Sequence, residues 1–205
     1  MYSIENLFHR FKAAFLIRRS PSLRELVAGP TVEITGIHVD LTKKQLDGTY
    51  DIYERIRHIE RLIASETVEI GVIFDSKGSI TAVRRGTTST VVFSDEEELL
   101  ATDHIVTHNH PNGGCLSDID LSFAFRVNLI ELRAVAGKKV HRILKPVKGW
   151  PQLHTLTERW DSEQRKVRHK RKLKQISGDQ AVKEWLELGI LVTKKLSLFT
   201  EPETL

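Results

Sequence analysis

The strongest restriction on the fold comes from a change in the spacing of apolar residues near position 65. From Ile52 to Ile63, isoleucines recur at steps of four, three and four in a charged background, which predicts a helix with one buried face. From Val68 to Phe74 the chain is β-rich, and turn residues at 75–78 followed by an extended run at 79–83 predict a β-hairpin. This alternation of helix and strand is typical of an α/β fold.

The same alternation continues to residue 144. A Ser-x-x-Glu capping box at Ser94 predicts a short helix, and a longer helix is expected to begin at Ser117. The longer helix is expected to carry its apolar rows on Leu121, Phe125, Leu129 and Leu132. Further extended segments are expected at residues 32–40, 87–93, 105–107, 134–136 and 140–144. These elements together predict an α/β sandwich.

Three segments are expected from the changes in composition. Residues 1–30 contain an amphipathic, Arg-bearing helix over 3–17. That helix either docks on the protein or a partner, or serves as an organelle presequence or a membrane-surface helix. Residues 31–150 form the α/β domain, and 151–205 form a helical C-terminal appendage whose amphipathic helix is expected to end at Gly189.

Composition narrows the class of protein. A chain of 205 residues with 40% apolar residues can build a core without a disulfide framework, and its single cysteine, Cys115, cannot form an intramolecular disulfide. This fits a reducing compartment, so a cytoplasmic location is expected. The apolar runs are far shorter than the roughly 18 residues that span a bilayer, so no membrane span is expected. Nothing in the sequence indicates an oligomeric state.

The formal charge of +4 has a local origin. The run from Arg165 to Lys174 contains seven Lys or Arg residues and no acidic residue, so the rest of the chain is mildly acidic. Such charge density favours phosphate binding, and nucleic acid is one expected partner. No aromatic residue interrupts the run, so base stacking is not indicated. A solvated linker and a contact with an acidic partner are equally open.

Residues suited to metal binding gather between His108 and Asp120. His108 and His110 lie two apart on an expected strand, so both imidazoles can point to one face and reach one point. Pro111 ends central strand pairing, and the two glycines that follow allow the chain to turn back. The next helix can then bring Asp120, one turn from its start, as a third ligand.

Two His and one Asp leave the fourth position of a tetrahedral zinc site open, which is typical of catalytic zinc. Bound zinc lowers the pKa of water toward ~7, and a nearby carboxylate is then needed as a base. Glu66 and Glu69 precede the hairpin, and Glu69 is preferred because it opens the apolar strand. The Ser117 hydroxyl could donate to the oxyanion of an attacked amide. These residues predict a zinc peptidase or isopeptidase.

The motif that these residues form resembles that of a known family. His108-x-His110-Pro111, followed by Ser117-x-x-Asp120, resembles the signature of the JAMM (JAB/MPN) metalloproteases. The sequence His-Asn-His-Pro is especially similar to that of the RadC-like and the phage- or toxin-associated bacterial branches. The interval between His110 and Ser117 is one residue shorter than is common in the family.

The resemblance covers residues 45–146 and implies a curved sheet between helices, akin to the deaminase-like fold. It implies hydrolysis of a peptide or isopeptide bond in a protein or peptide substrate, such as a ubiquitin-like conjugate. By the resemblance a Glu near position 69 is the general acid and base, and Ser117 assists the tetrahedral intermediate. The zinc ligands that it implies are His108, His110 and Asp120.

Other interpretations of the same residues stay open. Ser117-x-x-Asp120 is also a capping-box form, so both residues could serve only the helix start. Cys115 is either a redox-active thiol beside the metal or an inert, packed one. Residues 103–105 are similar to the opening of some HNH-type nucleases. A non-catalytic scaffold of JAB/MPN-like fold and a RadC-like, DNA-associated protein are further alternatives.

Overall fold

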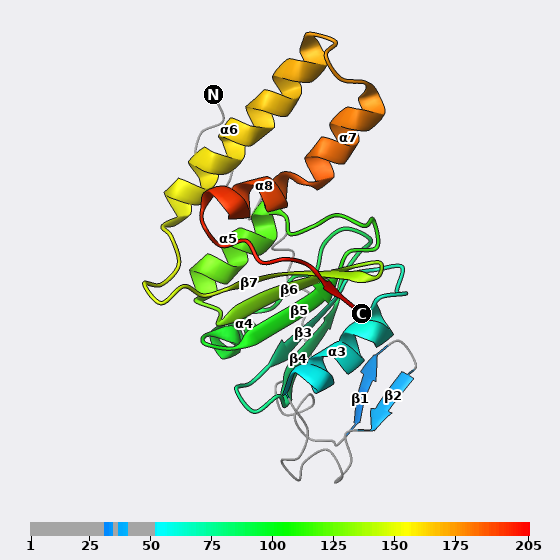
Figure 1. Ribbon diagram of the computed structural model, residues 1–205. Coiled ribbons are helices and arrows are strands. Elements are labelled where there is room, and N and C mark those ends of the chain that lie inside the picture. The colour runs from blue at the N-terminus through cyan, green and yellow to red at the C-terminus, as the bar shows by residue number, and fades with distance from the viewer. Residues whose placement is uncertain (1–30, 35–36, 41–51) are drawn as a thin grey trace.

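A computed structural model of the chain describes residues 31–34, 37–40 and 52–205 (Figure 1). The helix expected over residues 3–17 lies outside this part of the chain. Strands β1 (Thr31–Ile34) and β2 (Ile37–Asp40) pair antiparallel, which agrees with the extended segment expected at residues 32–40.

A mixed sheet forms the centre of the molecule, with strand order β4-β3-β5-β6-β7-β8. Its strands are β3 (Ile70–Phe74), β4 (Ile80–Arg85), β5 (Ile105–Asn109), β6 (Glu131–Ala136), β7 (Lys139–Leu144) and β8 (Glu203–Thr204). Strands β5 and β6 run parallel, and every other neighbouring pair is antiparallel. Because a parallel pair needs a crossover connection, the chain between β5 and β6 must leave the sheet and return, and it does so through a helix.

Helices cover both faces of the sheet, as Figure 1 shows, and the protein belongs to the α/β class. Helix α3 (Ile52–Ile63) lies on one face and buries Ile56, Ile59 and Ile63, as its apolar spacing predicts. The other helices are α4 (Asp95–Ala101), α5 (Asp118–Val127), α6 (Leu153–Lys172), α7 (Gly178–Leu186) and α8 (Leu188–Lys195). Among the described residues, no helix combines the length and the apolar character that crossing a membrane requires.

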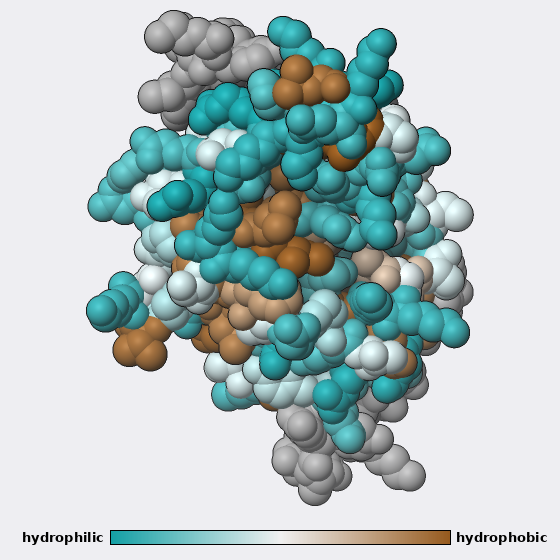
Figure 2. Space-filling view, turned by 45° about the horizontal axis from the view of Figure 1, so that its top comes forward, coloured by the Kyte–Doolittle hydropathy of each residue, from teal (hydrophilic) through white to brown (hydrophobic). Residues whose placement is uncertain are grey.

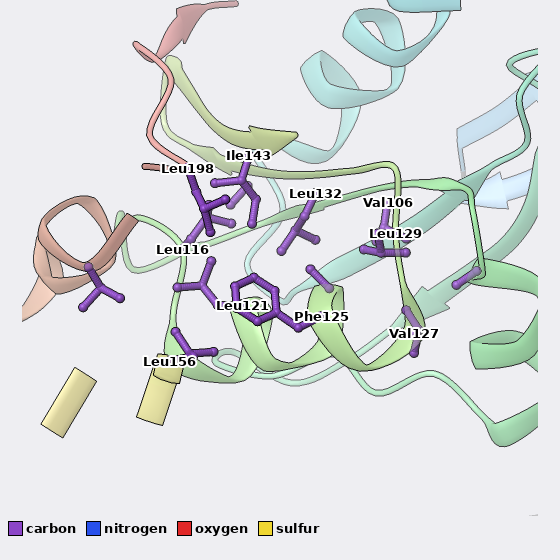
Figure 3. Packing of buried hydrophobic residues seen from close by; sticks show 14 of the residues in the cluster. Val106, Leu116, Leu121, Phe125, Val127, Leu129, Leu132, Ile143, Leu156 and Leu198 are labelled. Carbon is purple, nitrogen blue, oxygen red and sulfur yellow. The ribbon is translucent and has the colours of Figure 1, made fainter. Parts of the chain in front are cut away.

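The larger core cluster lies on the face opposite α3. It joins α5 to the sheet, and Figure 3 labels Leu121 and Phe125 of α5 beside Leu132 and Ile143 of the strands. Helices α6 and α8 add Leu156, Trp160, Val167, Leu188 and Val192 to the same cluster. Residues 31–150 and 151–205 therefore share one core, and β8 places the end of the chain at the sheet edge.

Alternation along β5 decides on which face each functional side chain lies. Val106 packs in the α5 cluster and Ile105 in the α3 cluster, so successive residues of the strand face opposite helices. Thr107 follows this rule, because its hydroxyl donates to Glu60 of α3. His108 therefore faces α5, which is the helix that follows it in the chain.

Two of the expected elements differ from those observed. Residues 87–93 do not form a strand but a loop, whose Val91 and Phe93 side chains lie so close over Gly71 that a Cβ at that glycine would meet Phe93 at 2.7 Å. The β-branched residues there serve packing rather than strand pairing. The helix from Ser117 ends at Val127, where left-handed Asn128 turns the chain, so Leu129 lies beyond the helix and Leu132 lies in β6.

The expected helix end at Gly189 was also wrong. Gly189 lies inside α8, which is separated from α7 by the single residue Glu187. A Cβ at this glycine would lie 1.9 Å from the carbonyl oxygen of Leu116, so only glycine lets α8 approach the loop before α5. This glycine therefore serves close packing rather than helix termination.

Candidate metal centre

The two imidazoles are positioned by the end of β5. His108 is its penultimate residue, and its side chain is 3% exposed. His110 lies one residue beyond the strand, but its N–H still donates to the carbonyl of Val135 at 2.8 Å, so the extended geometry continues. Both side chains therefore point to the α5 face, and their Nε2 atoms lie 2.8 Å apart.

The carboxylate comes from the first turn of α5. Asp120 Oδ1 lies 3.1 Å from His108 Nε2, and Oδ2 lies 3.3 Å from His110 Nε2. One ligand atom from each of the three residues lies within 4.8 Å of the other two. Ligand atoms on a tetrahedral zinc ion with bonds of about 2 Å are roughly 3.3 Å apart. The group could therefore hold one metal ion with only small adjustments.

The loop before α5 orients the second imidazole. His110 Nδ1 lies 2.9 Å from the carbonyl oxygen of Gly114, which can only accept a hydrogen bond. Nδ1 therefore carries the proton, and Nε2 is the nitrogen available to a metal. Such a partner on the far nitrogen is the usual means by which proteins fix the tautomer and direction of a metal-binding histidine.

The charges within the cluster favour the protonated form of His110 and the ionised form of Asp120. Burial opposes the charged form of His110, but the hydrogen bond and charge of Asp120 outweigh it and raise the pKa of His110 to about 9. Burial likewise opposes the charged form of Asp120, yet His108 and His110 hold its pKa well below the usual range. The three side chains thus favour a bound positive charge.

Glu69 faces the same cluster. Its side chain is largely buried, and burial raises the pKa of its carboxyl while the charges of His108 and His110 lower it. The carboxylate of Glu66 lies 3.7 Å from the guanidinium of Arg85. The structure brings Glu69 into electrostatic contact with the two histidines. Its backbone is held on both sides, by Gly86 and Thr87.

Comparisons with known proteins add no relative. Scans of protein-family models, of curated proteins and of solved structures each find no match to this chain. The function proposed below is therefore inferred from the site itself.

Ser117 forms the expected capping box with Asp120. Its hydroxyl accepts from the N–H of Asp120 at 3.2 Å and donates to Asp120 Oδ2 at 2.7 Å, and its own N–H donates to the same oxygen at 2.6 Å. The same hydrogen bonds thus serve two purposes, because they cap the start of α5 and also orient the Asp120 carboxylate toward the histidines.

Asn109 is a site residue that the sequence did not indicate. It lies between the two histidines, points to the opposite face and is 1% exposed. Its Oδ1 accepts from the N–H of Ile70 at 2.6 Å, and its Nδ2 donates to the carbonyl of Val68 at 2.9 Å. Asn109 therefore ties the histidine strand to the backbone on both sides of Glu69.

Cys115 and His104 do not join the cluster. Cys115 is buried, its thiol donates to the carbonyl of Leu186 at 2.9 Å, and burial raises its pKa, which disfavours the reactive thiolate. His104 precedes the other end of β5, where its Nδ1 lies 2.7 Å from the carbonyl of Thr102. Within the described part of the chain, the group that could hold a metal ion consists of His108, His110 and Asp120.

Proposed function

We propose that this protein is a zinc-dependent hydrolase of the JAMM type that cleaves a peptide or isopeptide bond in a protein substrate. The observation that carries the proposal is the convergence of two imidazole nitrogens and one carboxylate on a single point. His108, His110 and Asp120 are a ligand set suited to zinc, and three protein ligands leave one position for a reactant.

Each residue has a role in the proposal. When bound, zinc supplies a Lewis acid that polarises a carbonyl and makes water more acidic. Glu69 accepts the proton of the attacking water and returns it to the leaving nitrogen, a role suited to a carboxyl whose pKa is raised by burial. Ser117 supports the oxyanion only after its hydroxyl turns from Asp120, because a hydroxyl has one proton to donate.

The membership in the JAMM family and the JAB/MPN-like fold belong to the proposal as well. Their support is the order of elements around the motif: a strand that ends at the histidines, a Pro and Gly-Gly loop, and a helix capped by Ser-x-x-Asp. A mixed sheet with helices on both faces is compatible with that fold.

Metal content and hydrolysis test the proposal together. Purified protein should hold about one zinc per chain by elemental analysis, and His108→Ala combined with His110→Ala should abolish it. His104→Ala is the matched control, since this histidine lies at the other end of β5. Unchanged zinc content in the double variant would exclude this site.

Hydrolysis of a panel of ubiquitin-like conjugates is the second readout. Glu69→Gln should keep the zinc yet lower turnover by about 10²- to 10⁴-fold, because it removes the general base. Glu66→Gln should retain turnover, since the Glu66 carboxylate is directed to Arg85. Full activity in Glu69→Gln would rule out the role assigned to this carboxyl.

A further inference from the structure

Helices α6 and α7 form a hairpin that extends from the body of the molecule (Figure 1). Helix α7 carries Val182, Trp185 and Leu186 at spacings of three and four, so they form one apolar stripe. This stripe is not buried: the three side chains are 60%, 40% and 40% exposed. The view toward this end of the molecule shows apolar surface in the middle of a largely hydrophilic face (Figure 2).

The apolar stripe adjoins the loop that positions the metal ligands. The carbonyl of Leu186 accepts from the N–H of Cys115 at 3.3 Å, and a Cβ at Gly114 would lie 3.4 Å from the Leu186 side chain. Gly114 is also the residue whose carbonyl holds His110. A molecule bound along α7 would therefore lie beside Leu186, which contacts the loop whose Gly114 carbonyl orients His110.

The facing helix supplies positive charge. Arg165, Arg168 and Lys172 recur at steps of three and four, so they share one side of α6. The guanidinium of Arg168 lies 5.5 Å from the centre of the Trp185 ring, which joins the charged stripe to the apolar one. Among the described residues, Arg165 and Lys172 have no carboxylate within ion-pair distance, so their charges are available to a partner.

We propose that these two stripes, the hairpin surface, bind a segment of the protein substrate in which acidic residues flank apolar ones. This rests on the hydrolase function proposed above, for which the surface would supply substrate selection beside the metal centre. A second copy of this chain is disfavoured as the occupant, because it would bring two strongly basic runs together. Nucleic acid is disfavoured because the exposed stripe is mainly aliphatic and Arg168 covers the one aromatic ring, Trp185.

A binding experiment that does not depend on catalysis tests the proposal. Labelled full-length protein is applied to an array of synthetic peptides that vary independently in net charge and in Leu and Phe content. Peptides with Glu or Asp beside Leu or Phe should be retained best. Arg165→Glu and Val182→Ser should each weaken that retention by about tenfold, which corresponds to about 1.4 kcal/mol. Lys77→Glu and Leu99→Ser, at exposed positions elsewhere, should leave it unchanged.

The outcomes distinguish the proposed binding role of the hairpin surface from the proposed hydrolase function. The binding role proposed for the hairpin surface would be wrong if acidic and basic peptides were retained equally, or if neither hairpin variant changed the retention. This holds even if zinc binding and hydrolysis are confirmed. Conversely, the peptide preference can be present while hydrolysis is absent. Duplex DNA binding lost in Arg165→Glu but kept in Val182→Ser would instead assign the surface to nucleic acid. Dimerisation that Val182→Ser abolishes in sedimentation would assign it to a second copy.

Discussion

At the scale of single residues, the side chains of the candidate metal centre are held by groups of its own loop and helix cap. The Gly114 carbonyl fixes one nitrogen of His110, and Ser117 holds the carboxylate of Asp120 with two donors. Partners of this kind set the direction of a ligand before the metal arrives, so little rearrangement is needed on binding.

Zinc binding is expected to release about one proton per chain near pH 7. The pKa of His110 is raised to about 9, so below that pH the metal-free imidazole carries protons on both nitrogens. Nε2 must lose its proton to become a ligand, and the apparent zinc affinity should therefore fall about tenfold for each unit by which the pH drops below 9. Calorimetric titration in buffers of different ionisation enthalpy counts the protons. A count near zero would contradict this protonation state.

The sequence predicts some of these residues and misses others for a physical reason. His108, His110 and Asp120 are close in the chain, so strand alternation and one helical turn suffice to bring them together. Glu69 could not be separated from Glu66 in this way, because the difference depends on a partner strand and on where Arg85 lies. The role of Asn109 could not be predicted, since its partners lie about 40 positions earlier in the chain.

At the scale of elements, the junction between α7 and α8 packs against the loop that joins His110 to α5. Helix α8 crosses the loop at Gly189, where an added Cβ would lie 1.9 Å from the Leu116 carbonyl oxygen and 3.0 Å from the Cys115 sulfur. A side chain at this position would push the helix from the loop, and the loop carries the carbonyl that orients His110. Packing at one glycine thus connects the C-terminal helices to the candidate site.

Gly189→Ala is expected to destabilise the protein by about 1–3 kcal/mol, the usual cost of overpacking a tight contact. The added methyl group would lie 1.9 Å from the Leu116 carbonyl oxygen, so the backbone has to move. Gly178→Ala is a suitable control, because a Cβ at that helical position meets only the end of the Arg171 side chain at 3.7 Å. Urea unfolding followed by circular dichroism measures both. Equal stability of the two variants would argue against a rigid contact at residue 189.

Elements were predictable where a local pattern decides them. The isoleucine spacing of α3 and the capping boxes at Ser94 and Ser117 identify their helices from the chain alone. Residues 87–93 have the composition of a strand, but they pack over Gly71 rather than in a ladder. The burial of α6 and the short strand β8 depend on contacts with distant parts of the chain, which no local pattern contains.

At the scale of the whole molecule, a buried ion network connects three distant parts of the chain. Arg133 of β6 is 0% exposed and is bound by carboxylates of Glu60 in α3, Glu131 in its own strand and Glu203 in β8. Burial disfavours the charged guanidinium, but these carboxylates outweigh that effect and raise its pKa. The network thus ties the end of the chain to the sheet and to the helix on its far face.

Arg133→Met is expected to cost about 3–5 kcal/mol of unfolding free energy, because it leaves Glu60 buried without its cation and Glu131 with only its longer contact to Arg142. Arg126→Met removes a partly exposed pair with Glu98 and should cost no more than about 1 kcal/mol. Chemical denaturation of the two variants makes the comparison. If both lose the same small amount, the buried network contributes little beyond a surface pair.

The closeness of the metal ligands in the chain has a consequence for the folding equilibrium. All three lie within thirteen positions, so the loop that closes when they meet is short and its entropy cost is modest even in an unfolded chain. Unfolded protein can then chelate the ion with the same side chains, and such binding subtracts from the stabilisation that the ion gives to the native state. The ion should therefore raise the melting temperature by less than its affinity for the native protein alone implies, and it can be captured before the surrounding sheet has formed.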